Sequence, residues 1–326
     1  MSRSGDIAVG LNAVIMAVTE DQPRVLTVDS TAEGAAETER PALPYGPLDA
    51  EADRTLELGL RDWVRQQTGL DLGYVEQLYT FADRDRDPSR RRGGPRLLSV
   101  AYLALVREVE KVAGEGSRWR DVYAFFPWED WRDGRPEVIE RIREAVPEWE
   151  EAGSSAEERE RRAERAELAF GLGGAGWDGY QVLERYELLY EIGLVREAWT
   201  DADREAEIGS RELLGEPMAL DHRRILATAL SRVRGKIKYR PVVFELMPPQ
   251  FTLFQLQKVV ESLAGVELHK QNFRRLVEKG GLVEGTGRID PQTGGRPAEL
   301  FRFRREVLRE RLAPGFGVPS PRPPRA

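Results

Sequence analysis

The sequence of 326 residues predicts an α+β protein with a large N-terminal domain and a small C-terminal module. Strand-like and amphipathic helical runs are mixed through the first part of the chain, which indicates layers of both kinds. From Phe251 onward the order is helix, turn, helix and hairpin. The charge divides in the same way: Arg234 to Arg305 contains 14 basic and 7 acidic residues, or +7, whereas the whole chain carries −7 and the remainder therefore −14. A basic module on an acidic body is typical of nucleic-acid binding.

The composition excludes several classes of site. There is no cysteine, so a disulfide scaffold, a thiolate zinc site and a cysteine nucleophile are all excluded. The two histidines, His222 and His269, are far apart, so no histidine-rich metal site is expected. The apolar run IAVGLNAVIMAV follows no basic cluster and precedes no cleavage site, which argues against a signal peptide. No run is long enough to span a membrane, and we expect a cytoplasmic protein without membrane contact.

The N-terminal third predicts a hairpin, a helix and two further strands. Residues 6–30 read as two strands around the turn cluster Glu20–Pro23. A helix is expected from about Ala50 to Gln67, because its apolar residues share one face and Gly69 follows. The other elements expected here are a polar loop at 31–44, strands at 74–81 and 97–106, and a charged loop at 83–95.

The middle of the chain is less regular. Its aromatic patch at 122–131 is expected in a core or a dimer interface, and the charged run at 150–167 in an exposed helix. The segment GLGGAGWDG at 171–179 has no GKS or GKT, so it is expected to be a loop and not a phosphate-binding loop. Helices are expected at 180–195, stopped by Gly193, and at 218–237, with Asp221 as the N-cap and His222 either capping or supporting the helix.

The C-terminal module has the pattern of a winged helix-turn-helix. Thr252 can cap a helix over 253–265 that ends at Gly265, and a second helix is expected at 269–280, beginning at His269. Strands at 281–287 and 298–304 then enclose a Gly-rich basic tip, 288–297.

In such a module the second helix enters the major groove. Arginine can bind guanine, and glutamine or asparagine can bind adenine, through paired hydrogen bonds to the base edge. Wing arginines would reach phosphates or a narrow minor groove. The expected DNA contacts are Thr252, Lys270, Gln271, Asn272, Arg274, Arg275, Arg288 and Arg296, with Asn272 on the boundary of the core-facing side. The alternative is a winged helix used for protein contacts. Because one winged helix reads a short site, a homodimer on a palindromic double-stranded operator is expected.

Two long stretches resemble the Nudix-related transcriptional regulators of NAD metabolism. The first is YVEQLYTFADRDRDP followed by LLSVAYLALV, and the second runs from LDHRRILATALSRVRGKIKYRP through NFRR to GGRPAELFRF. The resemblance covers about 6–106 and 218–304. The region 107–217 is longer than in compact members, which fits a larger subgroup with an insertion.

This resemblance implies a Nudix-like α/β/α sandwich at 1–233, with the insertion at about 107–217, that senses an effector. A winged helix would occupy 234–312, and 313–326 would be a disordered tail. The protein would be a dimeric repressor of NAD synthesis or salvage genes. Its effector would be a nucleotide, ADP-ribose, NAD or ATP, and no cofactor or metal is expected.

The Nudix box of the related hydrolases is degenerate here. Its glycine, glutamate and arginine positions hold Leu48, Arg54, Asp62, Trp63, Gln66 and Gln67, although Gly46 is close by. Hard cations such as Mg²⁺ need anionic oxygen ligands, which glutamine and tryptophan do not supply. Val64 and the helix end at Thr68-Gly69-Leu70 do match the box, so the positions that serve packing are kept. We expect no hydrolysis of the ligand.

The charged loop offers ligand-binding arginines. Arg84, Arg86 and Arg90, with Arg91 and Arg92 beside them, would bind ligand phosphates; otherwise the loop is solvated or contacts DNA. Two alternatives to the regulator remain. One is an active Nudix hydrolase with a DNA-binding appendage, its metal held by carboxylates such as Glu57, Asp62 or Asp83. The other is a scaffold that does not bind DNA.

Overall fold

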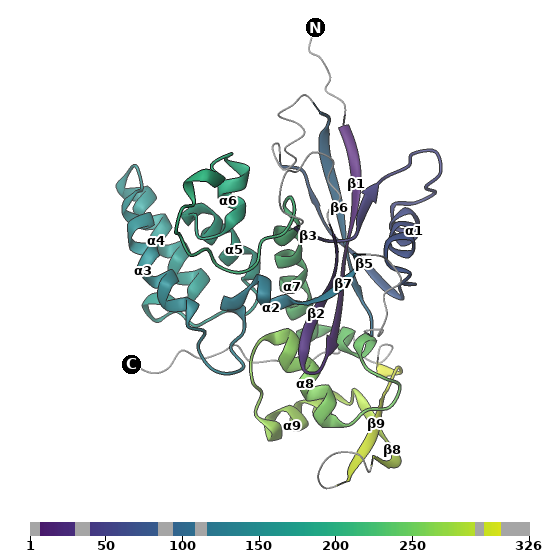
Figure 1. The fold of residues 1–326 in the computed structure, drawn as a ribbon. Helices are drawn as coiled ribbons and strands as arrows, with labels where there is room; N and C mark the ends of the chain where they lie inside the picture. Colours follow the sequence, from purple (N-terminus) through teal and green to yellow (C-terminus); the bar gives the residue numbers. More distant parts are fainter. Residues whose placement is uncertain (1–6, 30–39, 84–93, 108–115, 291–296, 308–326) are drawn as a thin grey trace.

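The computed structural model describes residues 7–29, 40–83, 94–107, 116–290 and 297–307. A mixed sheet lies at its centre, with helix α1 (Leu56–Thr68) on one face and helix α7 (His222–Tyr239) on the other (Figure 1). Further helices lie beyond α7, and the C-terminal module occupies the lower end of the molecule (Figure 1). The expected α+β class and the α/β/α layering are confirmed. The expected disordered tail, 313–326, lies outside the described residues.

The sheet is built on one long strand, β1 (Ile7–Thr19), which pairs in parallel with β6 (Arg96–Leu105). The path through the sheet is β3-β2-β1-β6-β5, with β4 beside β1 and β7 beside β2. The remaining strands are β2 (Gln22–Asp29), β3 (Pro41–Ala42), β4 (Tyr45–Pro47), β5 (Tyr74–Phe81) and β7 (Arg118–Asp121). The four predicted N-terminal strands are therefore confirmed. Strand β7, which the sequence placed in the insertion, belongs to the sheet.

Helix α1 begins at Leu56, later than the expected start near Ala50. The reason is local: Asp49 accepts hydrogen bonds from the backbone N–H groups of residues 51 and 52, which closes a turn. Thr55 then caps the helix by accepting from the Leu58 N–H, and Gly69 ends it with φ of 73°. The buried face of α1 packs on one side of the sheet, with Leu60 and Val64 among the sheet residues Leu11, Ile15, Val100 and Tyr102.

Helix α7 is buried on both sides, because the sheet covers one face and inserted helices cover the other. It begins at His222, four residues later than the expected start at 218, and Asp221 occupies the N-cap position without a side-chain cap hydrogen bond. His222 supports the helix, as expected: its Nδ1 accepts from the Leu43 N–H at 3.0 Å and its Nε2 lies 3.0 Å from Asn12 Nδ2. The helix runs without a break past the expected domain boundary at 233/234.

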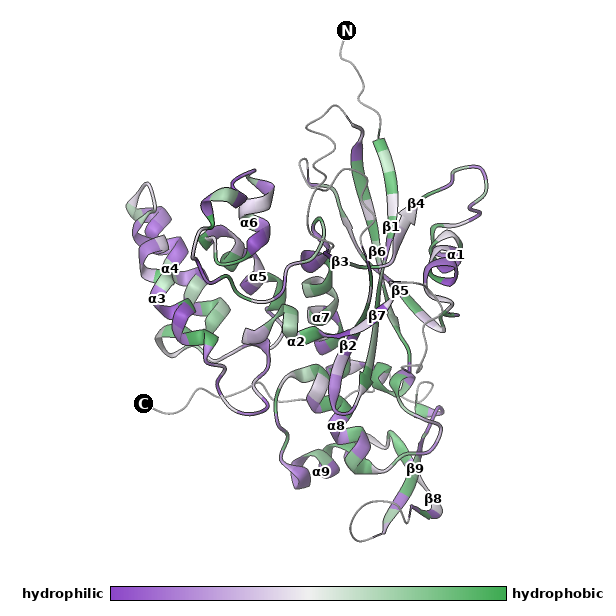
Figure 2. Cartoon of the chain, viewed as in Figure 1, coloured by the Kyte–Doolittle hydropathy of each residue, from purple (hydrophilic) through white to green (hydrophobic). Residues whose placement is uncertain are grey.

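The inserted region is helical. Its helices are α2 (Val122–Phe125), α3 (Val138–Glu151), α4 (Ala156–Phe170), α5 (Val182–Ile192) and α6 (Arg196–Asp201). The charged run at 150–167, expected as one exposed helix, is divided: α3 ends at Glu151, and α4 begins at Ala156 after the N-cap Ser155. Helix α4 itself is largely hydrophilic (Figure 2). The segment expected as a loop at 171–179 contains a short 3₁₀ helix, Leu172–Gly174. The aromatic patch forms core, with Phe125, Phe126 and Trp128 fully buried.

None of the helices in the described ranges is long and apolar enough to cross a membrane.

Candidate DNA-binding surface and ligand pocket

The first helix of the C-terminal module, α8 (Leu253–Ala264), has well-defined ends. Thr252 Oγ1 accepts from the Gln255 N–H, and the Gln255 side chain accepts from the Thr252 N–H, which completes a capping box. Gly265 ends the helix with φ of 69°. The predicted start and stop are confirmed, because both signals act within one helical turn.

Thr252 itself departs from the expected set of DNA contacts. Its side chain is 4% exposed, and its hydroxyl is taken up by the cap. We therefore assign Thr252 to helix capping and not to DNA contact.

The second helix, α9 (Lys270–Gly280), has one buried and one open face. Phe273 and Val277 are buried in the module. The five residues of α9 that were expected to contact DNA are all exposed: Lys270, Gln271, Asn272, Arg274 and Arg275. Asn272, which the sequence left undecided, lies on the exposed side. Arginine, glutamine and asparagine on one exposed helix are the residue types that read base edges in a major groove.

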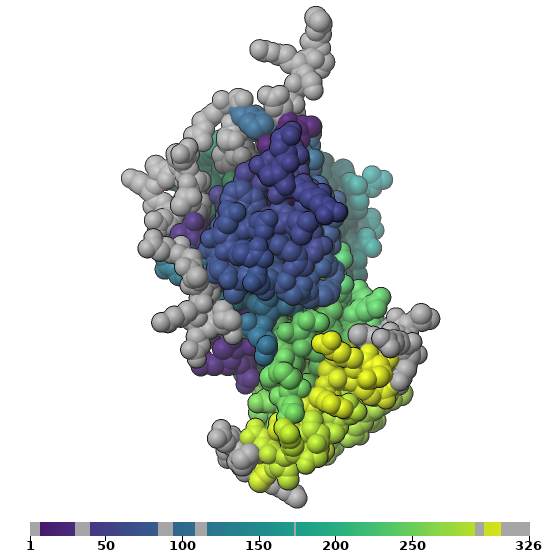
Figure 3. Space-filling model, turned by 90° about the vertical axis from the view of Figure 1, so that its right-hand side faces the viewer, coloured from purple at the N-terminus to yellow at the C-terminus, as the bar shows by residue number. Residues whose placement is uncertain are grey.

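The wing consists of β8 (Val283–Asp290) and β9 (Ala298–Phe303). The segment before α8 adds to it, since Phe251 and Phe301 exchange backbone hydrogen bonds of 3.0 and 2.8 Å. Phe244 stacks on Phe303 at a ring distance of 4.2 Å, which fixes the wing to the rest of the module. Arg288 is exposed near the tip, whereas Arg296 lies outside the described residues. Figure 3 shows the module as the yellow and green end of the molecule, below the face formed by α1.

On α1, the position of the first box glutamate holds Trp63, and its side chain has a structural role. The indole N–H donates to the Pro47 carbonyl at 2.8 Å. Its ring lies so close to Gly46 that a Cβ on that glycine would meet it at 2.2 Å. Trp63 thus fixes the strand β4 against the helix.

Gln67 is engaged in a similar way. Its Nε2 donates to the Tyr45 carbonyl at 2.6 Å, and its Oε1 accepts from the Tyr45 N–H at 3.1 Å. The amide both donates and accepts here, which an ionised carboxylate could not do because it has no proton to donate. Gln66, the neighbouring box position, is exposed. Helix α1 therefore packs against β4 and is hydrogen-bonded to it through Trp63 and Gln67.

The carboxylates that an active site would need are each paired with an arginine. Glu57 accepts from Arg61 at 2.8 Å and Asp62 from Arg65 at 2.9 Å, both on α1. Asp83 faces Arg224 of α7 at 3.4 Å, on the other face of the sheet. Among the described residues, no group of three or more histidine, aspartate or glutamate side chains is arranged to hold a metal ion.

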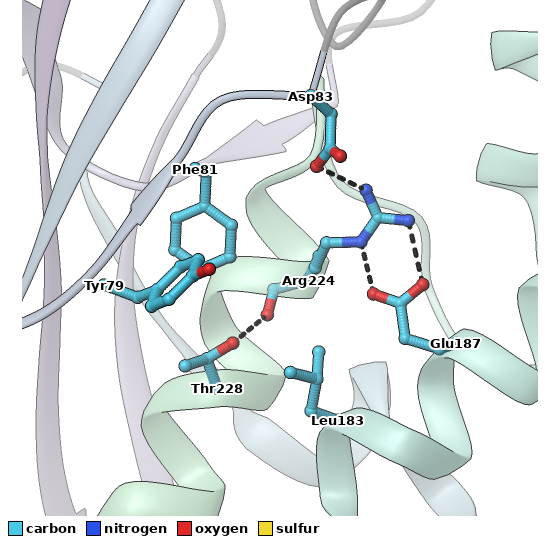
Figure 4. A pocket seen from close by; sticks show the side chains of 7 residues that line it. All are labelled: Tyr79, Phe81, Asp83, Leu183, Glu187, Arg224 and Thr228. Atoms are coloured by element: carbon cyan, nitrogen blue, oxygen red, sulfur yellow. Dashed lines mark hydrogen bonds and ion pairs between the residues drawn. The ribbon is translucent and has the colours of Figure 1, made fainter.

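A pocket of about 330 Å³ lies on the α7 side of the sheet, between β5, α5 and α7 (Figure 4). Its lining combines two aromatic rings, an ion-pair chain and two smaller side chains: Tyr79, Phe81, Asp83, Leu183, Glu187, Arg224 and Thr228. Tyr79 and Phe81 meet edge to face at 5.4 Å, and Tyr79 remains 63% exposed. A flat ring could stack on that exposed face.

Arg224 organises the polar wall of this pocket. Its Nη2 donates to Glu187 Oε2 at 3.0 Å, its Nε forms an ion pair with Oε1 at 2.5 Å, and its guanidinium lies over the Tyr190 ring. Burial raises the pKa of the Glu187 carboxyl, and the arginine offsets this only in part. The described charged residues of the pocket are one cation, Arg224, and two carboxylates, Glu187 and Asp83. A ligand phosphate would therefore need further cations to bind here. The expected ligand arginines, Arg84, Arg86 and Arg90, follow Asp83 directly in sequence but lie outside the described residues.

Sequence reasoning missed the pocket. Tyr79 and Phe81, two residues apart in a strand, carried a usable signal, because such residues share one face of a sheet. Glu187 and Arg224 carried none, since they are 37 positions apart and meet only through the packing of α5 on α7.

Comparison with known proteins agrees with this geometry. Residues 243–303 match the family of the NrtR DNA-binding winged helix domain. A curated protein of Acinetobacter baylyi, named ADPR responsive transcriptional repressor NtrR, is 32% identical over 125 residues, which are 38% of this chain and 50% of that protein. The chain thus spans about half the length of the curated relative that it matches.

Solved structures resemble nearly the whole chain. Shewanella oneidensis NrtR, solved in complex with a 27mer DNA, is 19% identical and has a TM-score of 0.54 over 92% of this chain and 94% of its own. A MutT/nudix family protein of Enterococcus faecalis is 16% identical, with a TM-score of 0.51 over 93% and 89%. Residues 243–303 therefore match the NrtR DNA-binding winged helix domain, and the fold of nearly the whole chain is similar to the folds of Shewanella oneidensis NrtR and of the Enterococcus faecalis protein.

Proposed function

We propose that this protein is a DNA-binding transcriptional regulator, a repressor of genes for NAD synthesis or salvage. The observation that carries the proposal is the exposed polar side of α9, where five polar side chains stand out while Phe273 and Val277 anchor the helix. The named activity of the curated relative supports a repressor. Such a regulator works in the cytoplasm, where the DNA is.

A gel-shift titration on the promoter beside its own gene tests this function. Binding should weaken steeply with salt, because each neutralised phosphate adds about 0.9 to the log–log slope. Arg274→Ala with Arg275→Ala should abolish specific binding. The control is Arg143→Ala with Arg161→Ala, which removes the same charge from exposed positions of α3 and α4. Equal binding by the two double variants would show that α9 is not the recognition helix.

We further propose that a nucleotide, ADP-ribose, NAD or ATP, controls DNA binding, and that no other cofactor is involved. The relative is described as ADPR responsive. The pocket in Figure 4 offers the exposed ring of Tyr79 for a base, and the arginines after Asp83 would meet the phosphates. Titrating the three nucleotides separately into the DNA complex identifies the effector. Tyr79→Ala should weaken the response, and Tyr239→Ala, an exposed tyrosine outside the pocket, should leave it unchanged.

The Nudix-like site is proposed to be inactive. The supporting contacts are those of Trp63 with Pro47 and of Gln67 with Tyr45, which occupy the positions where metal-binding glutamates would stand. Incubation with ADP-ribose and Mg²⁺ should release no AMP. Mg²⁺-dependent turnover would favour the alternative, an active hydrolase using Glu57, Asp62 or Asp83.

The regulator is proposed to act as a homodimer on a palindromic operator, because a single α9 reads only a short site. Size-exclusion chromatography with light scattering tests the dimer, and the symmetry of DNA selected from random duplexes tests the operator.

A further inference from the structure

The inserted region meets the C-terminal module at a buried ion triad. Glu129 follows α2 in the inserted region, Arg185 lies on α5 and Arg234 lies on α7; their side chains are 0 to 3% exposed. Arg185 donates to both oxygens of Glu129, at 2.5 and 3.0 Å, and Arg234 Nη1 donates to Oε2 at 2.5 Å. Burial alone would raise the pKa of Glu129, but the two guanidinium groups lower it, so the carboxyl is ionised.

Each arginine is further held by backbone carbonyls. Arg185 Nη1 donates to the carbonyls of Ala169 and Asp178, at 2.8 and 2.9 Å, and its guanidinium lies 3.9 Å from the Trp177 ring centre. Arg234 donates to the Leu263 carbonyl at 3.0 Å, and Leu263 is in the last turn of α8. The triad therefore extends from the inserted helices into the C-terminal module.

Other contacts surround the same end of α8. Tyr123 donates its hydroxyl proton to the Ser262 carbonyl at 2.6 Å, and the Trp131 N–H donates to the Gly265 carbonyl at 2.7 Å. Carbonyls in the last turn of a helix have no partner within the helix, so these donors satisfy them. Gly265 leaves room for this contact: a Cβ there would lie 2.3 Å from the Glu129 carbonyl oxygen.

We infer that Glu129, Arg185 and Arg234 are positioning residues for DNA recognition, which fix the end of α8, and with it α9, relative to the inserted region and the sheet. Helix α9 begins five residues after Gly265, so its direction depends on how that end is held. The inserted region is then part of the DNA-reading apparatus. This inference rests on the proposed DNA-binding function.

The consequence concerns sites with two half-sites. A dimer gains affinity from its second recognition helix only when both helices are held at the spacing of the operator. Loosening the end of α8 should therefore reduce binding to a full operator more than binding to one half-site. Loss of folding would reduce both together.

The test uses the full chain, which has no cysteine, so paired labels can be introduced without other changes. Arg161→Cys in α4 and Lys279→Cys in α9 are spin-labelled, and the labelled protein is diluted with unlabelled protein so that distances arise within one chain. The duplexes are an operator selected from random DNA by this protein and the same duplex with one half-site scrambled. Glu129→Gln removes the central charge, and Tyr123→Phe removes one donor to α8 at less risk to folding. Glu191→Gln, which breaks an exposed pair with Arg165 in the same region, is the control.

Wild type and Glu191→Gln should give one narrow distance distribution. Glu129→Gln, and Tyr123→Phe to a smaller degree, should broaden it and weaken full-operator binding by about tenfold, with half-site binding changed by less than about twofold. A narrow distribution in a folded variant, or a broad one with an unchanged ratio of full-site to half-site affinity, would overturn the inference. If Glu129→Gln does not fold, Tyr123→Phe decides. If wild type binds no DNA, the proposed function has failed. The distance distribution still tests whether these residues hold α9 in place relative to the inserted region.

Discussion

Replacing Gln67 by glutamate restores a box carboxylate and should destabilise the protein. The amide donates to the Tyr45 carbonyl at 2.6 Å and accepts from the Tyr45 N–H at 3.1 Å. An ionised carboxylate would lose the donor and face the carbonyl oxygen, at a cost of about 1–3 kcal/mol. At roughly 2–4 °C per kcal/mol for a domain of this kind, the melting temperature should fall by several degrees. Gln66→Glu is the matched control, because it adds the same charge in the same helical turn at an exposed position.

The effect of Gln67→Glu should depend on pH. The neutral carboxyl can still donate to Tyr45, so its pKa in the folded protein is raised above the value of about 4.3 in the unfolded chain. Stability is then fully present below that unfolded pKa and is lost as the pH rises through the folded pKa. Melting curves of the two variants at pH 5 and pH 7.5 measure this. The reasoning is refuted by equal melting temperatures at pH 7.5, or by a difference that does not shrink at pH 5.

Three further predictions concern stability. Thr252→Ala should cost about 1 kcal/mol through the lost cap. Its DNA affinity, measured well below the melting temperature, should be unchanged, and weaker binding by the folded variant would return Thr252 to the DNA contacts. Gly265→Ala should lower the melting temperature, because φ is 69° and a Cβ would meet the Glu129 carbonyl oxygen. Gly235→Ala should raise it, because Gly235 lies within α7 with open space around a Cβ. A change of the same sign in both variants would contradict this account. Burial raises the pKa of Asp201 to about 6. The stability contributed by the neutral carboxyl is therefore fully present below the unfolded pKa and is lost as the pH rises through about 6. In denaturant titrations the free energy of unfolding of Asp201→Asn should rise relative to that of wild type between about pH 5 and pH 8.

The recognition module was predictable from sequence because its signals are local. The cap at Thr252 and the glycine stops at Gly265 and Gly281 act within a turn of the residues they end, and the periodicity of α9 already separated Phe273 and Val277 from the polar side. The start of α1 was wrong for the opposite reason. Helix propensity extends over residues 50–55, but Asp49 and Asp53 use their carboxylates to close a turn there.

The candidate site was only partly predictable. The substitution of Gln67 for glutamate is visible in the sequence, but its pairing with Tyr45, 22 positions away, is not. The pocket needs three segments, β5, α5 and α7, to meet. The helix at 180–195 was predicted, but nothing in the sequence placed it at this pocket or indicated that β7 joins the sheet.

By itself, the sequence determined the kind of molecule: an acidic sheet domain with a degenerate Nudix box, and a basic winged helix whose polar face is set by the helical repeat. Only the tertiary structure decided how the two are joined. Glu129 lies 56 positions from Arg185 and 105 from Arg234, and nothing in such spacings marks them as partners. They meet because burying a carboxylate requires opposite charge and hydrogen bonds around it, and packing of the inserted helices on α7 brings both guanidinium groups to that point.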